Sequence, residues 1–419
     1  TQQQLAWQRG ELYMFVHFGI STFTGLEWGL GTENPDIFHP VQYNPQQWAN
    51  LAREAGFKGL ILTAKHVDGF CLWPSKLTQH SVAASRWREG KQDVVRDVAE
   101  ACRRAGIHFG VYIALWDRNS PSYNSSAYNN FFASQLDELL TGYGPIYEIW
   151  MDPGHDIGIS EPPYDFNRYY NAMRQHQPGA LIFGPDVRWI GNETGMAKET
   201  QWSPLDSTRW YPAECDVSIR VNWFWHEQDT VKSLPELLDI YFNSIGRNSV
   251  LLLNVPPNRD GIISEQDIVR LREFRSALNG IFSVDLTRGA RAVAGNVRRE
   301  MGDSLGWAAQ NVIDGKPATF WATDDSVQSS WLEIELEGEK TLNVIELQEP
   351  IEYGQRIASY TVEAWRENKW EKINEGTTIG YKKLARIPTI TTRKLRVIIH
   401  SARACPALQK IGLFKEPGK

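Results

Sequence analysis

The chain has 419 residues, of which 44 are Lys or Arg and 50 are Asp or Glu, so its formal net charge is −6. This acidic balance excludes a nucleic-acid binder with a basic surface, and a hydrophobic content of 42% excludes a disordered or fibrous chain. The chain is rich in aromatic residues, with 17 Trp, 15 Tyr and 17 Phe, which indicates either a large core or a ligand, such as a sugar, that packs on flat apolar faces.

From residue 12 to residue 282 the chain alternates short apolar runs with amphipathic helical patterns. Runs that are apolar throughout are typical of strands buried on both faces. The repeated strand–helix units predict a parallel sheet, and residues 1–285 suit a (β/α)8-type barrel. The irregular segment 185–221 leaves the sixth and seventh strands unplaced. In chain order, we expect strand 12–18, helix 45–55, strand 57–63, helix 92–104, strand 107–115, helix 130–140, strand 146–151, helix 166–175, strand 180–183, helix 234–245, strand 250–254 and helix 265–277.

The pattern changes after residue 283, where short alternating strands are separated by Gly, Asn, Asp or Pro. Strands at this spacing predict an all-β sandwich over residues 286–419. The strands that we expect there cover 329–336, 341–348, 359–365 and 394–400.

Cysteine and apolar patterns limit the class of protein further. The four cysteines are scattered and form no C-x-x-C pair, which argues against a disulfide-stapled small domain and a cysteine zinc site. Apolar runs such as Ser249–Val255 are far shorter than the roughly 20 residues that span a bilayer, so we expect no membrane insertion. Thr1 is not a natural start, and we expect a removed leader and a secreted or periplasmic location.

Candidate catalytic carboxylates follow the predicted strands, because barrel sites are built at the carboxyl ends of the strands. Asp152 directly follows an apolar strand and precedes a Pro-Gly turn, and Glu193 lies in a later loop. Together they suit glycoside hydrolysis, with one carboxylate as nucleophile and one carboxyl group as acid. A helix cap or a salt-bridged loop role for Asp152 and a solvated surface role for Glu193 remain open, and Glu199 and Glu214 are competing acids.

Histidine and tryptophan side chains accompany these carboxylates. His17 and His66 follow two adjacent predicted strands, where neutral imidazoles could bind the hydroxyls of one sugar or could instead be ordinary core residues. No spacing of His, Asp or Glu indicates a metal site, so we predict no catalytic metal. Indole faces suit sugar C–H surfaces, and we predict further sugar contacts from Trp73, Trp116, Asp117, Arg188 and Trp223.

At these residues the sequence resembles glycoside hydrolase family 29, the retaining α-L-fucosidases. The resemblance covers nearly all of residues 5–282, and its most specific part is the Lys-His-x-Asp-Gly-Phe segment. Segments 116–119 and 191–193 resemble the branch that prefers α-1,3 and α-1,4 linkages in Lewis-type glycans. The matching stretches are Phe15–Gly19, Glu27–Gly29, Leu62–Trp73, Gly110–Tyr112, Ile149–Asp152 and Ser249–Pro256, with Asn258, Asp260 and Gly261.

The resemblance implies a role for each matching residue. Asp152 corresponds to the nucleophile and Glu193 to the general acid/base; His17 and His66 match residues that bind fucose hydroxyls, and Glu27 and Trp28 match the motif at the sugar pocket. The chain departs from the family at Val67, where many members have a second His, and at Pro153, where Gly commonly follows the nucleophile.

The C-terminal segment resembles a discoidin domain, also called a coagulation factor 5/8 type C domain. The match lies in segments 311–315, 318–321 and 331–334. Such domains often bind sugars and some hold a structural Ca²⁺, and a scaffold without a ligand is an equal alternative. No cofactor is expected for catalysis.

The predicted function is therefore a retaining exo-α-L-fucosidase that removes α-1,3/1,4-linked fucose from fucosylated oligosaccharides or glycoconjugates. Two alternatives stay open at this point: a broad-specificity α-L-fucosidase of the same family, and a carbohydrate-binding protein without catalysis. The physiological glycan and the oligomeric state are not predicted.

Overall fold

The computed structural model describes residues 1–154, 164–202, 210–299 and 306–418. Its contacts divide the chain into two compact units. The barrel unit comprises Thr1–Gly195, Glu214–Leu237 and Leu251–Phe274. The sandwich unit comprises Met196–Ala213, Leu238–Val250 and Arg275–Lys419. The domain boundary predicted between residues 285 and 286 stays a prediction.

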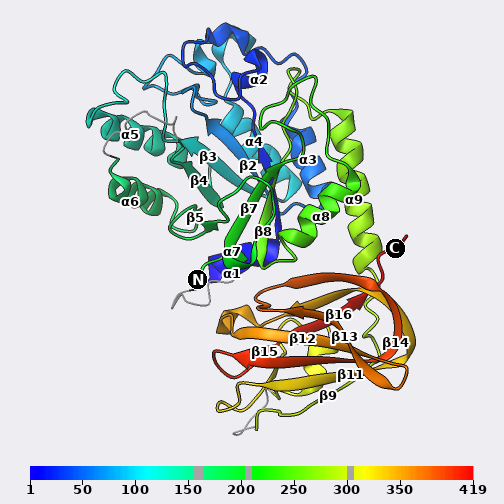
Figure 1. The fold of residues 1–419 in the computed structure, drawn as a ribbon. Helices are drawn as coiled ribbons and strands as arrows, with labels where there is room; N and C mark the ends of the chain where they lie inside the picture. The colour runs from blue at the N-terminus through cyan, green and yellow to red at the C-terminus, as the bar shows by residue number, and fades with distance from the viewer. Residues whose placement is uncertain (155–163, 203–209, 300–305, 419) are drawn as a thin grey trace. The chain divides into compact units, whose positions relative to one another are not determined.

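The barrel unit is built on an eight-stranded sheet in the order β5-β4-β3-β2-β1-β8-β7-β6. Strand β1 pairs in parallel with both β2 and β8. The two outer strands are joined by an isolated parallel bridge between Phe183, directly after β5, and Val187, directly before β6. The predicted barrel-type fold is confirmed (Figure 1). The strands are β1 Leu12–Val16, β2 Gly59–Lys65, β3 His108–Ala114, β4 Glu148–Asp152, β5 Leu181–Ile182, β6 Arg188–Trp189, β7 Ala213–Ser218 and β8 Ser249–Asn254.

Helices follow the strands where their end signals predict them. Helix α3 begins after Asn44, whose side chain accepts from the Gln47 amide, and ends at the left-handed Gly56. Helix α4 is capped in the same way by Asp93 and Gly106. The long helices are α1 Gln2–Gly10, α3 Pro45–Ala55, α4 Val94–Ala105, α5 Ala127–Thr141, α6 Phe166–His176, α8 Leu234–Asn243 and α9 Glu265–Phe282; α2 Ser21–Thr24 and α7 Glu199–Trp202 are short.

Strand β7 occupies part of the segment that the sequence left unplaced. It contains Glu214 and Asp216, both fully or almost fully buried, so its sequence does not read as an apolar strand. Alternate residues of a strand face opposite sides of the sheet. Glu148, Trp150 and Asp152 on β4 therefore share one side of the sheet. This side is the barrel interior, where Trp150 donates to Glu214 of β7 and Asp152 accepts from Tyr112 of β3.

The sandwich unit contains a mainly antiparallel sheet in the order β13-β12-β14-β11-β16, with β9 paired to β11. Two strands that the sequence predicts separately form one strand, β11, whose pairing with β14 shifts register after Glu335 and after Leu342. The predicted sandwich is confirmed, with a core of aliphatic side chains around Trp321. Its strands are β9 Arg291–Ala294, β10 Trp321–Ala322, β11 Ser330–Gln348, β12 Ile357–Arg366, β13 Lys369–Gly376, β14 Lys383–Ala402, β15 Ala407–Leu408 and β16 Lys410–Phe414.

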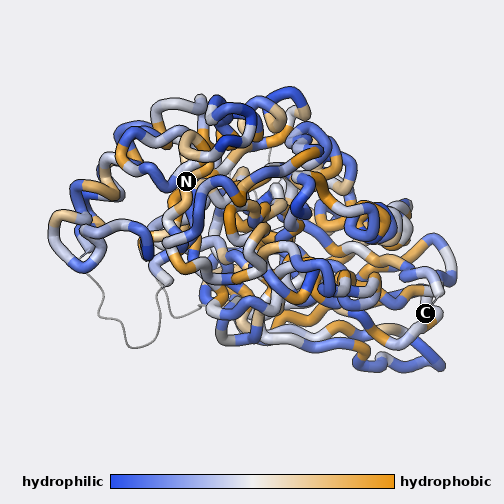
Figure 2. The backbone as a smooth tube through the Cα atoms, turned by 90° about the horizontal axis from the view of Figure 1, so that it is seen from above, coloured by the Kyte–Doolittle hydropathy of each residue, from blue (hydrophilic) through white to orange (hydrophobic). Residues whose placement is uncertain are grey.

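Hydrophobic and hydrophilic segments alternate along the described residues, as Figure 2 shows. Among the described residues, no helix has both the length and the apolar character needed to cross a bilayer.

Candidate active site

The ends of strands β1, β2 and β3 bring aromatic and histidine side chains together. The rings of His17 and His66 have centroids 5.8 Å apart, and His66 stacks on Tyr112 at the same separation. Phe224 closes against both imidazoles, with centroids 5.4 Å from His17 and 5.0 Å from His66. Trp223 lies 5.0 Å from His17. The two predicted sugar-binding histidines thus belong to one aromatic cluster.

Asp152 adjoins this cluster at the end of β4. The Tyr112 hydroxyl donates a 2.5 Å hydrogen bond to Asp152 Oδ2, and the amide of Gly154 donates a 2.8 Å bond to Oδ1. Burial raises the pKa of Asp152, while both hydrogen bonds oppose the rise by stabilising the anion. Pro153 has no N–H, so the residue after it supplies the amide. The carboxylate is thereby fixed in orientation, as a nucleophile requires.

The histidines are held neutral. Burial lowers the pKa of His17 well below its usual value, and lowers that of His66 to about 3. The backbone amide and Nδ1 of His17 both lie within hydrogen-bonding distance of Asn254 Oδ1, at 3.1 and 2.9 Å, so the proton sits on Nδ1 and Nε2 is left as an acceptor. Nδ1 of His66 is buried without a hydrogen-bond partner among the described residues. Both rings can therefore exchange hydrogen bonds with ligand hydroxyls.

Glu27 organises one wall of the cluster. Its carboxylate accepts from the amides of Trp223 at 2.8 Å and Phe224 at 3.1 Å, and lies 2.9 Å from Nε2 of His226. Burial raises the pKa of Glu27, and these hydrogen bonds act in the opposite direction. The structure therefore gives Glu27 a positioning role for Trp223, and its predicted direct contact with sugar stays a prediction.

Glu193 lies on an exposed loop that strand β7 anchors at both ends. The amide of Ile190 donates to the Glu214 carbonyl at 3.0 Å, and the amide of Gly195 donates to the Asp216 carbonyl at 3.1 Å. Trp223 Nε1 donates to Glu193 Oε2 at 3.2 Å, which ties this loop to the aromatic cluster. An exposed carboxyl group beside this aromatic cluster can reach the oxygen of a substrate bound there.

Asp216 connects the two predicted catalytic residues. Burial raises its pKa to about 7, and the charges of Glu193 and Asp152 add to the rise. Both carboxylates therefore lie close enough to Asp216 to affect its titration. The indole N–H of Trp189 donates to Asp216 Oδ1 at 2.7 Å.

The competing acids Glu214 and Glu199 differ in their surroundings. Glu214 is fully buried, accepts from Trp150 Nε1 at 2.7 Å and hydrogen-bonds with Glu148, which accepts from Trp7 Nε1 at 2.8 Å. Burial and the neighbouring carboxyl group raise the pKa of Glu214, so this pair holds a proton inside the barrel. Glu199 belongs to the sandwich unit.

Three other residues predicted to bind sugar, Trp73, Asp117 and Arg188, have no contact with the aromatic cluster among those described above. Trp73 is 2% exposed and its indole N–H is taken by Glu138 at 2.9 Å. Asp117 is buried, 2.9 Å from Lys65 Nζ, and also accepts from two backbone amides. Arg188 has a buried Nε without a hydrogen-bond partner among the described residues, and burial lowers its pKa. The sugar contacts assigned to these three residues stay predictions.

Trp28 and Trp116 form a separate pair. Trp28 is 53% exposed and meets the buried Trp116 edge to face, with centroids 5.7 Å apart. The guanidinium of Arg118 lies 4.2 Å from the Trp116 ring and donates to the carbonyl of Gly29 at 2.9 Å. This arrangement fixes the segment that carries Glu27 and Trp28.

Several residues of the site had no role from sequence reasoning: Tyr112, Trp189, Asp216 and Asn254. Tyr112 lies two strands from β1, and its parallel pairing with Trp150 predicts proximity to Asp152 once the strand order is known. Asp216 was hidden because strand β7 itself was not predicted.

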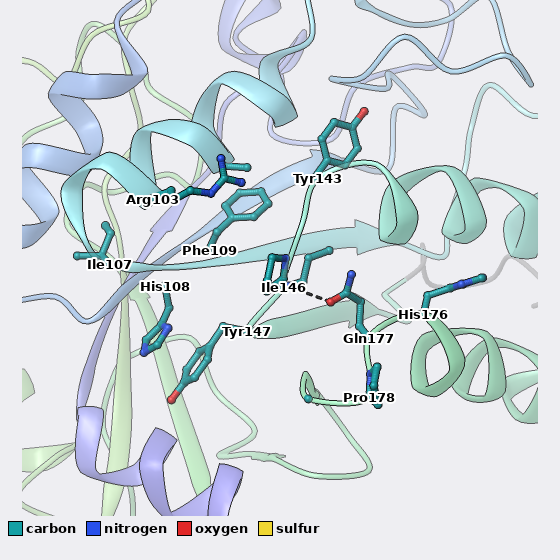
Figure 3. A pocket seen from close by; sticks show the side chains of 13 residues that line it. Arg103, Ile107, His108, Phe109, Tyr143, Ile146, Tyr147, His176, Gln177 and Pro178 are labelled. Atoms are coloured by element: carbon teal, nitrogen blue, oxygen red, sulfur yellow. Dashed lines mark hydrogen bonds between the residues drawn. The ribbon is translucent and has the colours of Figure 1, made fainter.

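A cavity of about 650 Å³ lies away from these residues, where β3 and β4 begin. Figure 3 shows Arg103, His108, Tyr143, Tyr147 and His176 around it. It contains none of the predicted site residues. No group of three or more His, Cys, Asp or Glu side chains within the described ranges could hold a metal ion, and the structural Ca²⁺ suggested for the sandwich stays a prediction.

Comparisons with known proteins agree on one family. A family model described as alpha-L-fucosidase matches residues 7–279, and one described as F5/8 type C domain matches residues 299–410. Alpha-L-fucosidase 1 of Arabidopsis thaliana is 43% identical over 444 aligned positions, covering 99% of this chain and 87% of the relative. The human plasma alpha-L-fucosidase is 25% identical, covering 58% of this chain and 55% of its own. A Ruminococcus gnavus fucosidase of family 29, solved with fucose, superposes with a TM-score of 0.92 at 32% identity, covering 100% of this chain and 95% of that one.

Proposed function

Since the chain belongs to the α-L-fucosidase family, glycoside hydrolase family 29, we propose that it is a retaining exo-enzyme for α-1,3/1,4-linked fucose in Lewis-type oligosaccharides. The fucosidase activity is the premise that the family provides. The retaining course, the linkage preference and the residue roles are the proposal.

The observation that carries the residue roles is the difference between the two carboxylates. Asp152 is clamped by Tyr112 and Gly154 beside a buried ring cluster, whereas Glu193 is exposed on a loop that reaches the same cluster through Trp223. A fixed carboxylate suits attack on the anomeric carbon, and an exposed carboxyl group suits proton exchange with a leaving oxygen and then with water.

The proposed reaction has two displacements. Glu193 donates a proton to the glycosidic oxygen while an Asp152 oxygen attacks the anomeric carbon, which breaks the glycosidic bond and forms a covalent fucosyl–enzyme ester. Glu193, now a carboxylate, takes a proton from water as the water oxygen attacks the same carbon. The ester bond breaks, Asp152 is regenerated, and the two inversions give net retention. This course requires carboxyl groups about 5–5.5 Å apart.

The pocket suits fucose in two respects. Neutral His17 and His66 can each bind a hydroxyl, and the apolar rings of Tyr112, Trp223 and Phe224 suit a sugar whose exocyclic carbon is a methyl group. The linkage proposal rests on the segments Trp116–Asn119 and Gly191–Glu193, which resemble the Lewis-type branch.

Two measurements test the catalytic roles. Asp152→Asn should lower kcat/KM by at least about 10³-fold, since removing a nucleophile removes the covalent route. Azide should rescue Glu193→Ala by forming fucosyl azide with retained configuration. Rescue of Glu199→Ala in place of Glu193→Ala would assign the acid to Glu199. Normal turnover by Asp152→Asn would overturn the nucleophile assignment.

The linkage proposal has its own test. The ratio of kcat/KM for a Lewis-type trisaccharide to that for an aryl α-L-fucoside should be high. A low ratio would indicate the broad-specificity alternative, and no release of fucose from either substrate would indicate a binding protein without catalysis. We also propose a secreted or periplasmic location, and a second domain from residue 286 that binds sugar or Ca²⁺; fractionation of cells and calorimetry with glycans and Ca²⁺ test these points.

A further inference from the structure

Trp189 is an exposed indole that the protein holds in place. Its side chain is 44% exposed, yet its N–H donates a 2.7 Å hydrogen bond to the buried carboxylate of Asp216. A buried acceptor fixes the ring orientation, while part of the large apolar ring remains in water. Arg188 is the neighbouring residue on β6. Its side chain faces the opposite side of the sheet, because successive side chains of a strand alternate.

Trp189 is joined to strand β7 next to the segment that carries Glu193. Its indole donates to Asp216 of β7, and the charges of Glu193 and Asp152 both raise the pKa of that carboxyl group. The loop that carries Glu193 starts directly after Trp189 and is anchored on β7 through Ile190 and Gly195. The exposed ring and the exposed acid therefore belong to one short, anchored segment.

The proposed substrate consists of a fucosyl group and a leaving group, and the buried surroundings of Asp152 suit only the fucosyl group. His17, Phe224 and Tyr112 are buried and close the side of the site where the proposed fucosyl group is held. The leaving group is attached to the oxygen that Glu193 protonates, so it must lie on the exposed side next to Glu193. Trp189 provides an apolar face on that side.

We propose that Trp189 is a stacking platform for the leaving-group sugar and a determinant of oligosaccharide specificity. The inference rests on the proposed function and adds a contact outside the fucose pocket. The platform binds the C–H face of the pyranose ring next to fucose, and Asp216 acts as a positioning residue by fixing the indole.

The test compares two substrates with the same demand for acid catalysis. A Lewis-type trisaccharide and methyl α-L-fucoside both have alkoxide leaving groups that need a proton from Glu193, but only the trisaccharide has a sugar to stack on Trp189. Trp189→Ala should lower kcat/KM for the trisaccharide by about 10-fold more than for methyl fucoside, the effect of one lost aromatic contact. The loss should appear mainly in KM if the contact is made equally in ground and transition states.

Two further variants sharpen the result. Trp189→Phe keeps a flat apolar face without the N–H and should recover most of the trisaccharide preference. Trp331→Ala is the matched control, because Trp331 has a similar exposure of 39% but lies on β11 of the sandwich unit, and it should leave the ratio of the two activities unchanged.

The outcomes separate this inference from the proposed function. An equal loss on both substrates would mean that Trp189 only supports the acid loop, and an unchanged ratio would mean that the ring is an ordinary exposed side chain; either result overturns the platform. If the wild-type enzyme released no fucose from either substrate, the proposed function would fail first.

Discussion

Glu346 in the sandwich and Glu214 in the barrel are both buried, but their neighbours have opposite charge. In the sandwich, buried Glu346 lies 2.6 Å from Lys410 Nζ and 3.6 Å from Lys382 Nζ; burial acts to raise its pKa, but the lysines hold the pKa below its usual value. In the barrel, buried Glu214 faces Glu148, and both pKa values are raised. Glu346 is therefore stabilised as an anion by two lysines, whereas Glu214 and Glu148 are stabilised as a protonated pair.

The comparison shows where the fold accepts a cost in stability. The sandwich core around Glu346 is aliphatic, and the cations of Lys410 and Lys382 stabilise the charge of this carboxylate. In the barrel, burial raises the pKa of Asp152 and of Asp216, and for Asp216 the charges of Glu193 and Asp152 add to the rise.

The largest effect is expected where the barrel does neutralise a buried charge. Lys65 is fully buried, with Nζ 2.9 Å from both Asp117 Oδ2 and Gln135 Oε1. Lys65→Met should lower the free energy of unfolding by about 3–5 kcal/mol, because it leaves the Asp117 carboxylate buried without its cation. Urea denaturation followed by tryptophan fluorescence measures this loss.

The control is the exposed ion pair of Arg272 and Glu54, whose side chains are 54% and 49% exposed. Arg272→Met should cost at most about 1 kcal/mol. Equal losses in the two variants would show that the barrel does not depend on its buried pair.

The next effect tests the apolar core of the sandwich. Leu332 on β11 is fully buried in that core. Leu332→Ala should destabilise the protein by about 2–5 kcal/mol through lost burial and the cavity left behind. The kcat of the folded variant should remain that of wild type at a temperature where both proteins are native. A loss of kcat without a loss of stability would contradict the separation of roles between the units.

A smaller effect is expected on the nucleophile. Tyr112→Phe removes the hydrogen bond to Asp152 Oδ2 and should lower kcat/KM by about 10- to 100-fold. That bond lowers the pKa of Asp152, so its removal raises the pKa and should move the acidic limb of the kcat/KM profile to higher pH. Tyr123→Phe, a change at another buried tyrosine, is the control; a profile that does not move in Tyr112→Phe would rule out this influence on Asp152.

The smallest effect concerns the carboxyl pair in the barrel. Burial raises the folded pKa of Glu148 to about 7, above its ordinary value of 4.5, so the folded protein binds more protons than the unfolded chain in this interval. The stability from the pair is therefore present below pH 4.5 and is lost as the pH rises towards 7. Relative to wild type, Glu148→Gln with Glu214→Gln should gain about 1–2 kcal/mol between pH 5 and pH 8.

The sandwich should respond with the opposite sign. The folded pKa of Glu346 is lowered, so its contribution is present at neutral pH and is lost as the pH falls. Glu346→Gln should therefore lose stability relative to wild type at pH 7 and recover it in acid. Parallel pH profiles for the barrel and sandwich variants would contradict the opposite pKa shifts of Glu148 and Glu346.

Sequence reasoning reached the architecture because the apolar strands and capped helices carry local signals. Helix α3 lies where its Asn-Pro start and Gly end predict it. Strand β7 was missed because its inward side chains are acids, and acids at alternate positions read as a loop. A search for apolar runs cannot identify a strand such as β7, whose buried side chains are polar and bind other polar groups.

The site was predictable only as far as its motifs extend. Asp152, His17 and His66 stand at strand ends that the pattern identifies, and the structure brings them to one cluster. The sequence does not show that Trp189 donates to Asp216, because it does not show which side of the two-residue strand β6 faces β7; the sugar contact of Arg188 stays a prediction. Nor does it show that Glu27 accepts from the backbone amide of Trp223, a residue 196 positions away.

The two backbone hydrogen bonds that anchor the Glu193 loop have a consequence for protein engineering. The loop between Ile190 and Gly195 is closed on β7 by main-chain groups, so the identities of its intervening side chains are not needed to hold its ends. We therefore expect this segment to accept substitutions that keep Glu193 and its contact with Trp223. Such variants would change the residues around the acid while the strands that hold Asp152 and the histidines remain intact, so the loop is a suitable place to alter the choice between hydrolysis and glycan synthesis.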